Sequence, residues 1–151
     1  MSTEEAAKAL NELAKLIAEN TPDIVQTAAL TAKALIVDRL QEEGLDANEV
    51  QLAPYNPEYK KFKQKNYGYI ENFTNLTLTG NMLKRLEIIS EGGTSKGYEV
   101  VIGEKLQEDK DKVNYNSQRY GDIMRLAKSE EEKLQKGIDS QLNKLIKQAG
   151  L

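Results

Sequence analysis

The centre of the chain alternates between polar and apolar positions and is then interrupted by glycines. Residues 74–79 alternate leucines with threonines, a pattern typical of a half-buried β-strand. Two apolar runs flank the glycine-rich stretch 92–97, so residues 85–103 are predicted to form a β-hairpin. We therefore expect a small antiparallel sheet made of this hairpin and the strand at 74–79.

Helical periodicity surrounds the predicted sheet on both sides. Residues 4–19 and 22–43 carry apolar positions three or four apart, which is typical of amphipathic helices. The Thr-Pro-Asp sequence at 21–23 is a helix-start signal, and it leaves open whether the chain breaks or only kinks there. A closing helix is predicted over 130–148 with Ser129 as its cap. The predicted fold class is thus α+β, with N-terminal helices and a C-terminal helix packed on the sheet.

A short basic helix is predicted from Pro57 to about Lys65, with Asn56 as its cap. Aromatic and lysine side chains are concentrated around it, and the segment that follows is expected to be an exposed loop. Bases could stack on the aromatics while lysines meet phosphates, or the same side chains could contact a neighbouring subunit. The candidate interface residues here are Tyr55, Tyr59, Lys60, Lys61, Phe62, Lys63, Lys65, Tyr67 and Tyr69.

The length of 151 residues indicates a single domain, 1–151. Within it, residues 1–20 are expected to form a helical extension. Residues 104–116 are polar and charged, and we expect them to form a mobile loop.

Composition narrows the possible functions. A formal net charge of −3 does not favour a nucleic-acid binder. Cysteine and histidine are both absent, which removes disulfides, thiolate metal sites and Ser-His or Cys-His catalysis. No apolar stretch is long enough to span a bilayer, and the acidic N-terminus is unlike a signal peptide. We therefore expect a protein that is not an enzyme, needs no cofactor or metal and does not enter a membrane.

Several sequence features occur in an order that resembles a known family. The features are Asp38-Arg39-Leu40 and Gly44; Pro54-Tyr55-Asn56-Pro57-Glu58-Tyr59-Lys60; Leu76-Thr77-Leu78-Thr79-Gly80-Asn81-Met82-Leu83; the hairpin; and Arg119-Tyr120-Gly121, Leu126 and Ser129-Glu130-Glu131. This order is similar to that of the tailed-bacteriophage virion morphogenesis proteins of the tail-completion and head-tail joining type. The resemblance covers roughly residues 25–146. The chain differs from many members by its lack of histidine and by the extra helix at 4–19.

The resemblance implies an α+β subunit that forms a ring in the virion neck, between the head connector and the tail. The implied partners are copies of itself, the connector or portal side, and tail-tube proteins, with at most a passing contact with genome DNA. The implied location is the virion, after assembly in the host cytoplasm. Arg119 and Tyr120 join the candidate interface on this basis. Asp38 and Arg39, at the end of the second helix, are candidates for pairing with charges on a neighbour. The alternative is a regulatory or scaffolding module whose helical ends bind a partner helix.

Overall fold

The computed structural model describes residues 1–68, 73–77 and 81–151, without the side chain of Asn81. In this part of the chain the fold is α+β with a small antiparallel sheet, which confirms the predicted class. The elements in chain order are α1 (Thr3–Asp38), the π-helical turn η1 (Arg39–Glu43), α2 (Pro57–Tyr67), α3 (Asn81–Lys84), β1 (Glu87–Thr94), β2 (Gly97–Gly103), α4 (Gln107–Tyr120) and α5 (Lys128–Gln148).

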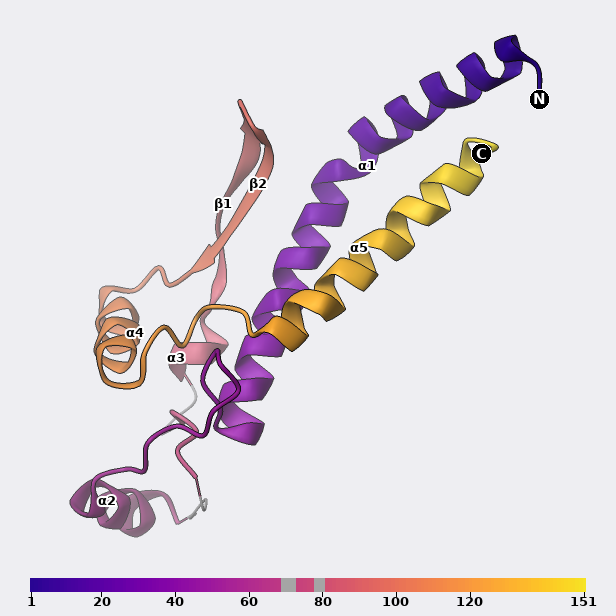
Figure 1. The fold of residues 1–151 in the computed structure, drawn as a ribbon. Coiled ribbons are helices and arrows are strands. Elements are labelled where there is room, and N and C mark those ends of the chain that lie inside the picture. The colour runs from indigo at the N-terminus through magenta and orange to yellow at the C-terminus, as the bar shows by residue number, and fades with distance from the viewer. Residues whose placement is uncertain (69–72, 78–80) are drawn as a thin grey trace.

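The two predicted N-terminal helices are one continuous helix, α1, with Pro22 inside it. Proline has no backbone N–H, so the carbonyl one turn earlier loses its usual partner. The two preceding side chains also bond to carbonyls one turn earlier: Asn20 donates to Leu16 at 2.8 Å and Thr21 to Ile17 at 2.6 Å. The helix changes direction along its length (Figure 1), and proline is a recognised cause of such kinks. The sequence signal at 21–23 therefore marks a kink, and residues 1–20 are the first half of α1.

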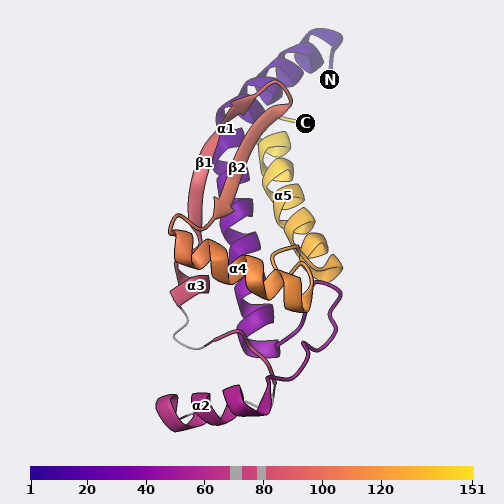
Figure 2. The same cartoon turned by 90° about the vertical axis from the view of Figure 1, so that its left-hand side faces the viewer.

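Helices α1 and α5 lie side by side and antiparallel, so both chain termini are found at one end of the molecule (Figure 1). The β1–β2 hairpin lies against α1, with α4 crossing beneath it (Figure 2). Helix α2 stands at the opposite end from the termini in both views. Within the described residues, no helix has both the length and the apolar character needed to cross a membrane.

The predicted strand at 74–79 is wrong for residues 74–77, which form no strand, while 78 and 79 lie outside the described residues. The side chain of Asn75 accepts a hydrogen bond from the Thr77 backbone N–H at 3.1 Å, which closes a tight turn. Leu76 inside this turn has a φ of 53°, a left-handed conformation incompatible with an extended strand. The described sheet therefore contains only β1 and β2, which pair as predicted.

The loop expected at 104–116 is also wrong, because residues from Gln107 onward form α4. Charge pairing supports this helix where apolar content is low. The Arg85 guanidinium lies 3.0 Å from the fully buried Asp109 carboxylate, and Lys112 pairs with Glu108 one turn away at 3.2 Å. Acidic side chains in the first turn also suit the positive end of the helix dipole.

The ends of two other helices test the predicted caps. Asn56 caps α2 as predicted, since its side chain accepts from the Glu58 backbone N–H at 2.8 Å. The cap predicted for the last helix is wrong, because α5 begins at Lys128. There, the backbone N–H of Ala127 donates to the Glu130 carboxylate at 2.7 Å, while the Ser129 hydroxyl donates to Glu49.

The core lies where the C-terminal half of α1 meets α3 and the loop before α5. Its buried apolar residues are Ile36, Leu40, Leu52, Met82, Leu83, Leu86 and Ile123. Gly44 follows η1 with a φ of 65°, as expected of a helix-terminating glycine. A Cβ at this position would lie 2.3 Å from the Phe73 ring and 2.6 Å from the Thr74 carbonyl, so space as well as conformation requires glycine.

A buried ion pair joins the end of α1 to the start of α5. Arg39 Nε lies 2.8 Å from Glu130 Oε1, and both side chains are about 95% buried, with exposures of 4% and 5%. The remaining guanidinium donors reach the backbone carbonyls of Arg125 at 2.8 Å, Leu45 at 3.3 Å and Ile123 at 3.4 Å. Arg39 was a candidate for pairing with a neighbouring subunit, and the structure instead places it inside the monomer.

Replacing Arg39 with methionine should destabilise the protein by about 3–5 kcal/mol, because it leaves the Glu130 carboxylate buried without its partner. Urea denaturation of purified protein measures this change. The matched control is Lys8→Met, which removes an exposed pair with Glu4 at 3.2 Å and should cost less than about 1 kcal/mol. Equal effects of the two substitutions would contradict the role assigned to Arg39.

Candidate protein-interaction site

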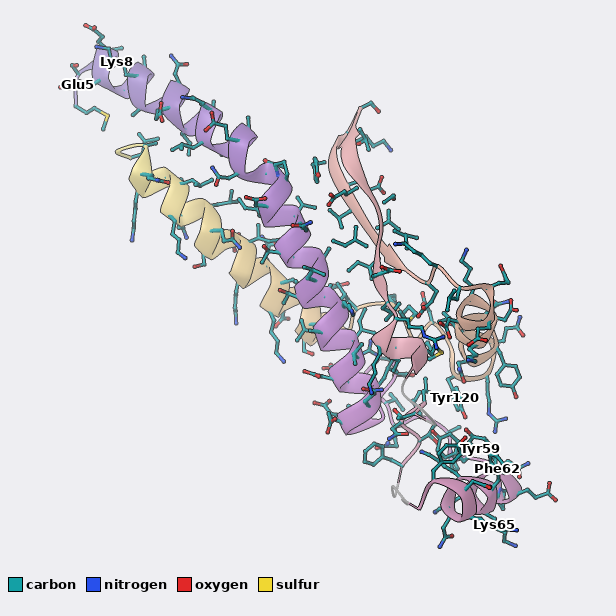
Figure 3. All side chains as sticks on the ribbon, turned by 180° about the vertical axis from the view of Figure 1, so that it is seen from behind. Glu5, Lys8, Tyr59, Phe62, Lys65 and Tyr120 are labelled. Carbon is teal, nitrogen blue, oxygen red and sulfur yellow. The ribbon has the colours of Figure 1, made fainter. Side chains whose placement is uncertain are left out.

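Aromatic rings form a continuous row along α2. Ring centroids are 5.1 Å apart for Tyr55 and Tyr59, 6.2 Å for Tyr59 and Phe62, and 6.3 Å for Phe62 and Tyr67. These distances are typical of favourable aromatic pairs. Phe62 nevertheless remains 48% exposed, and Tyr59 and Tyr67 are also exposed. In Figure 3, Tyr59 and Phe62 lie on the side of α2 nearer the rest of the molecule, and Lys65 lies on the far side.

The base of α2 is fixed by a polar cluster around Asn75. The Asn75 side-chain oxygen accepts from the Tyr55 hydroxyl at 3.3 Å and from Lys63 at 3.1 Å. The Lys63 ammonium also lies 5.0 Å from the centre of the Tyr55 ring, a cation–π distance. Burial raises the pKa of Tyr55 to about 12, with a smaller contribution from the nearby Tyr59 and Tyr120 hydroxyls. The cluster ties α2 to the 73–77 segment.

The lysines of α2 have two different environments. Lys63 was predicted to be an interface residue, yet it is buried in the Asn75 cluster and serves the monomer. Lys60, Lys61 and Lys65 are exposed, and none forms an ion pair with another described residue. Three exposed charges beside exposed aromatic rings form a surface suited to an acidic protein partner or a polyanion.

The remaining predicted residues lie off α2 or outside the described part. Arg119, near the end of α4, is exposed and has its guanidinium 5.4 Å from the Tyr120 ring centre. Tyr120 is half-buried against the core, so it supports the fold as well as facing the Tyr55 cluster. Tyr69 lies outside the described residues. We refer to the exposed residues Tyr59, Lys60, Lys61, Phe62, Lys65 and Tyr67 as the α2 surface.

A charged cluster between β2 and α4 was not found by sequence reasoning. Glu104 is buried, and neither of its carboxylate oxygens has a hydrogen-bond partner among the described residues. Burial raises the pKa of Glu104, and the negative charges of Asp109 and Glu87 raise it further, while Arg85 and Lys33 lower it. No local sequence pattern predicts this cluster, because its members come from five separate segments: α1, the residue after α3, β1, the residue after β2, and α4.

The α2 surface is suited to contact with another macromolecule. Among the described residues, no group of three or more His, Cys, Asp or Glu side chains is placed to hold a metal ion. No known protein family, curated protein or solved structure matches this chain.

The pKa of Glu104 leads to a pH prediction. Glu104 keeps its proton to higher pH in the folded protein than in the unfolded chain, where the pKa of a glutamate is near 4.5. The contribution of Glu104 to stability is therefore greatest below pH 4.5 and is lost as the pH rises through the folded pKa. Glu104→Gln should raise the free energy of unfolding at pH 7, and this advantage should shrink as the pH falls toward 4.5.

Urea denaturation at both pH values checks this prediction. Glu99→Gln, at an exposed position on β2, is the matched control and should change stability by no more than about 0.5 kcal/mol. A Glu104→Gln protein that is less stable than the wild type at pH 7 would show that the carboxylate is stabilising, contrary to the argument from burial.

Proposed function

We propose that this chain is a structural virion protein of a tailed phage, an adaptor of the neck or tail-completion type. It forms a ring that joins the head connector to the tail. The observation that carries the proposal is the α2 surface, an exposed row of aromatic rings and lysines held at one end of the subunit (Figure 3). Exposed aromatic clusters of this kind mark protein contact sites.

The motif residues behind the family resemblance support the same proposal. Leu40, Met82 and Leu83 all belong to the buried core, although they come from separate stretches of the chain. Arg39 and Glu130, from the first and last motifs, form the buried ion pair. Some of the residues that carry the resemblance therefore build the core of this fold, as expected if the likeness extends to architecture.

An adaptor of this kind acts through its interfaces. Neighbouring subunits are held by apolar burial and by charge complementarity, and head-to-tail contacts close into a ring when the rotation between subunits allows it. The partners are copies of the same chain, the connector or portal side, and tail-tube proteins. The protein is located in the virion neck or tail after assembly in the host cytoplasm, with at most a passing contact with genome DNA.

Quantitative mass spectrometry of gradient-purified tailed particles from the source virus or prophage tests the proposal. We expect this chain to be present at a ratio of small whole numbers to the connector protein. Tail-less heads from the same gradient are the control, and they should contain less of the chain. Absence from intact particles would remove the virion assignment and favour a regulatory or scaffolding module that binds a partner helix.

Phe62→Ala tests the α2 surface within the same system. Because Phe62 is about half exposed, its loss should destabilise the monomer by about 1 kcal/mol or less. The yield of joined particles should fall, since an exposed aromatic anchor is lost. Leu30→Ala, at an exposed apolar position on α1, is the matched control. Equal particle yields from the two variants would contradict a role for the α2 surface in assembly.

A further inference from the structure

The charges of this chain are divided unevenly along it. Helix α2 carries four lysines and one glutamate, although the whole chain has a net charge of −3. Residues 40–54 contain four acidic residues and no basic one. Within them, residues 42–50 run from the last two residues of η1 through the turn that follows, as far as the extended segment that leads to α2. We call these residues, with their four carboxylates, the acidic turn.

Hydrogen bonds within the subunit fix the conformation of the acidic turn. The Asp46 carboxylate accepts from the backbone N–H groups of Asn48 at 2.8 Å and Val50 at 3.0 Å. Arg125 donates to the Asn48 side chain at 2.8 Å, and Leu45 forms a β-bridge with Gln51. A turn that is ordered before binding loses little conformational entropy when a partner docks.

The exposed side chains of the turn complement those of the α2 surface. Glu42 and Glu43 are exposed, and neither is paired with a described basic residue. Val50, whose backbone N–H bonds to the Asp46 carboxylate, is a large apolar residue that is 59% exposed. The α2 surface has the matching set, with Phe62 beside exposed lysines. One surface thus combines exposed acids with an exposed aliphatic group, and the other combines exposed bases with exposed aromatic rings.

We propose that the α2 surface of one subunit docks on the acidic turn of a second copy of this chain. Lys61 and Lys65, one turn apart on α2, face Glu42 and Glu43, and Phe62 on the adjoining side of the helix covers Val50. Lys60, which projects away from Phe62, adds to the positive charge of the same helix. The inference deepens the proposed ring function and rests on it for its biological setting. It names the contact between neighbouring subunits.

The geometry favours docking between two copies over contact of the α2 surface with the acidic turn of its own subunit. The Asn75 cluster fixes the base of α2, and Figures 1 and 2 both show α2 apart from the turn at the end of α1. A contact between two different patches of the same molecule is heterologous, so it propagates from subunit to subunit and closes into a ring at a suitable rotation. The alternative occupant is DNA, whose affinity would depend on the lysines alone.

Charge reversal tests the docking. Lys60→Glu/Lys61→Glu/Lys65→Glu and Glu42→Lys/Glu43→Lys are made as two full-length variants. Sedimentation at low and physiological salt measures their self-association. Each variant alone should associate at least about tenfold more weakly than the wild type, because several attractive pairs become repulsive. Mixing the two variants should restore association, since each reversed surface meets its reversed complement. Lys136→Glu/Lys144→Glu/Lys147→Glu on α5 is the control for the triple reversal and should associate like the wild type.

Three results would overturn the inference: a wild type that stays monomeric at low salt, a mixture that fails to recover, or an α5 control that is equally impaired. Loss of duplex-DNA binding by the lysine variant with unchanged self-association would assign the α2 surface to DNA instead. The particle measurement separates the two proposals. If the chain is present in particles but this docking is not found, the proposed function stands and the proposed contact is wrong. If the docking is found but the chain is absent from particles, the contact stands and the proposed function is wrong.

Discussion

Arg39 carries a positive charge inside the protein, and the surroundings that this charge requires organise the fold. A buried guanidinium is tolerated only when a carboxylate balances its charge and acceptors satisfy its N–H groups. Glu130 supplies the carboxylate, 91 residues further along the chain, and three backbone carbonyls supply further acceptors. These partners belong to the turn after η1, the loop before α5 and α5 itself. One side chain thus holds four segments in register, and Leu40 packs beside it in the core.

The rest of the molecule depends on this junction. Helices α1 and α5 leave it as an antiparallel pair, and the hairpin lies along α1 (Figures 1 and 2). The acidic turn begins with the last two residues of η1, so the Arg39 bond to the Leu45 carbonyl also helps to orient it. Helix α2 has a separate anchor in the Asn75 cluster. A well-connected centre with projecting, chemically distinct surfaces is an architecture suited to assembly.

Local signals predicted much of the fold. Apolar spacing located the long helices, the glycine-rich stretch located the hairpin, and Asn56 identified the start of α2. The errors arose where a distant or competing contact was decisive. Residues 74–77 alternate like a strand, yet the Asn75 side chain closes a turn around Leu76. Helix α4 lacks an obvious apolar stripe, and its buried Asp109 is paired by Arg85 from outside the helix.

The candidate site shows the same division. Its aromatic row could be anticipated because the rings are close in sequence, whereas the burial of Lys63 could not, because its partner Asn75 is 12 residues away. The Arg39–Glu130 pair has no local sequence signature, and neither has the buried Glu104 carboxylate, which has no hydrogen-bond partner in the part of the chain that the structure describes. The sequence shows which charged residues are present, but only the folded structure determines which of them are buried.

Native-state hydrogen exchange of the isolated protein tests most directly whether the Arg39 junction holds the structure together. Amide protons with the greatest protection should lie in residues 36–40, 82–86 and 123–131, and they should share one opening free energy because these segments open as a unit. Protection should decrease along α1 and α5 toward the chain termini. If the slowest exchange occurred instead in the terminal halves of those helices, with a fast-exchanging junction, the fold would be organised by the helix pair, and the central place given to Arg39 would be wrong.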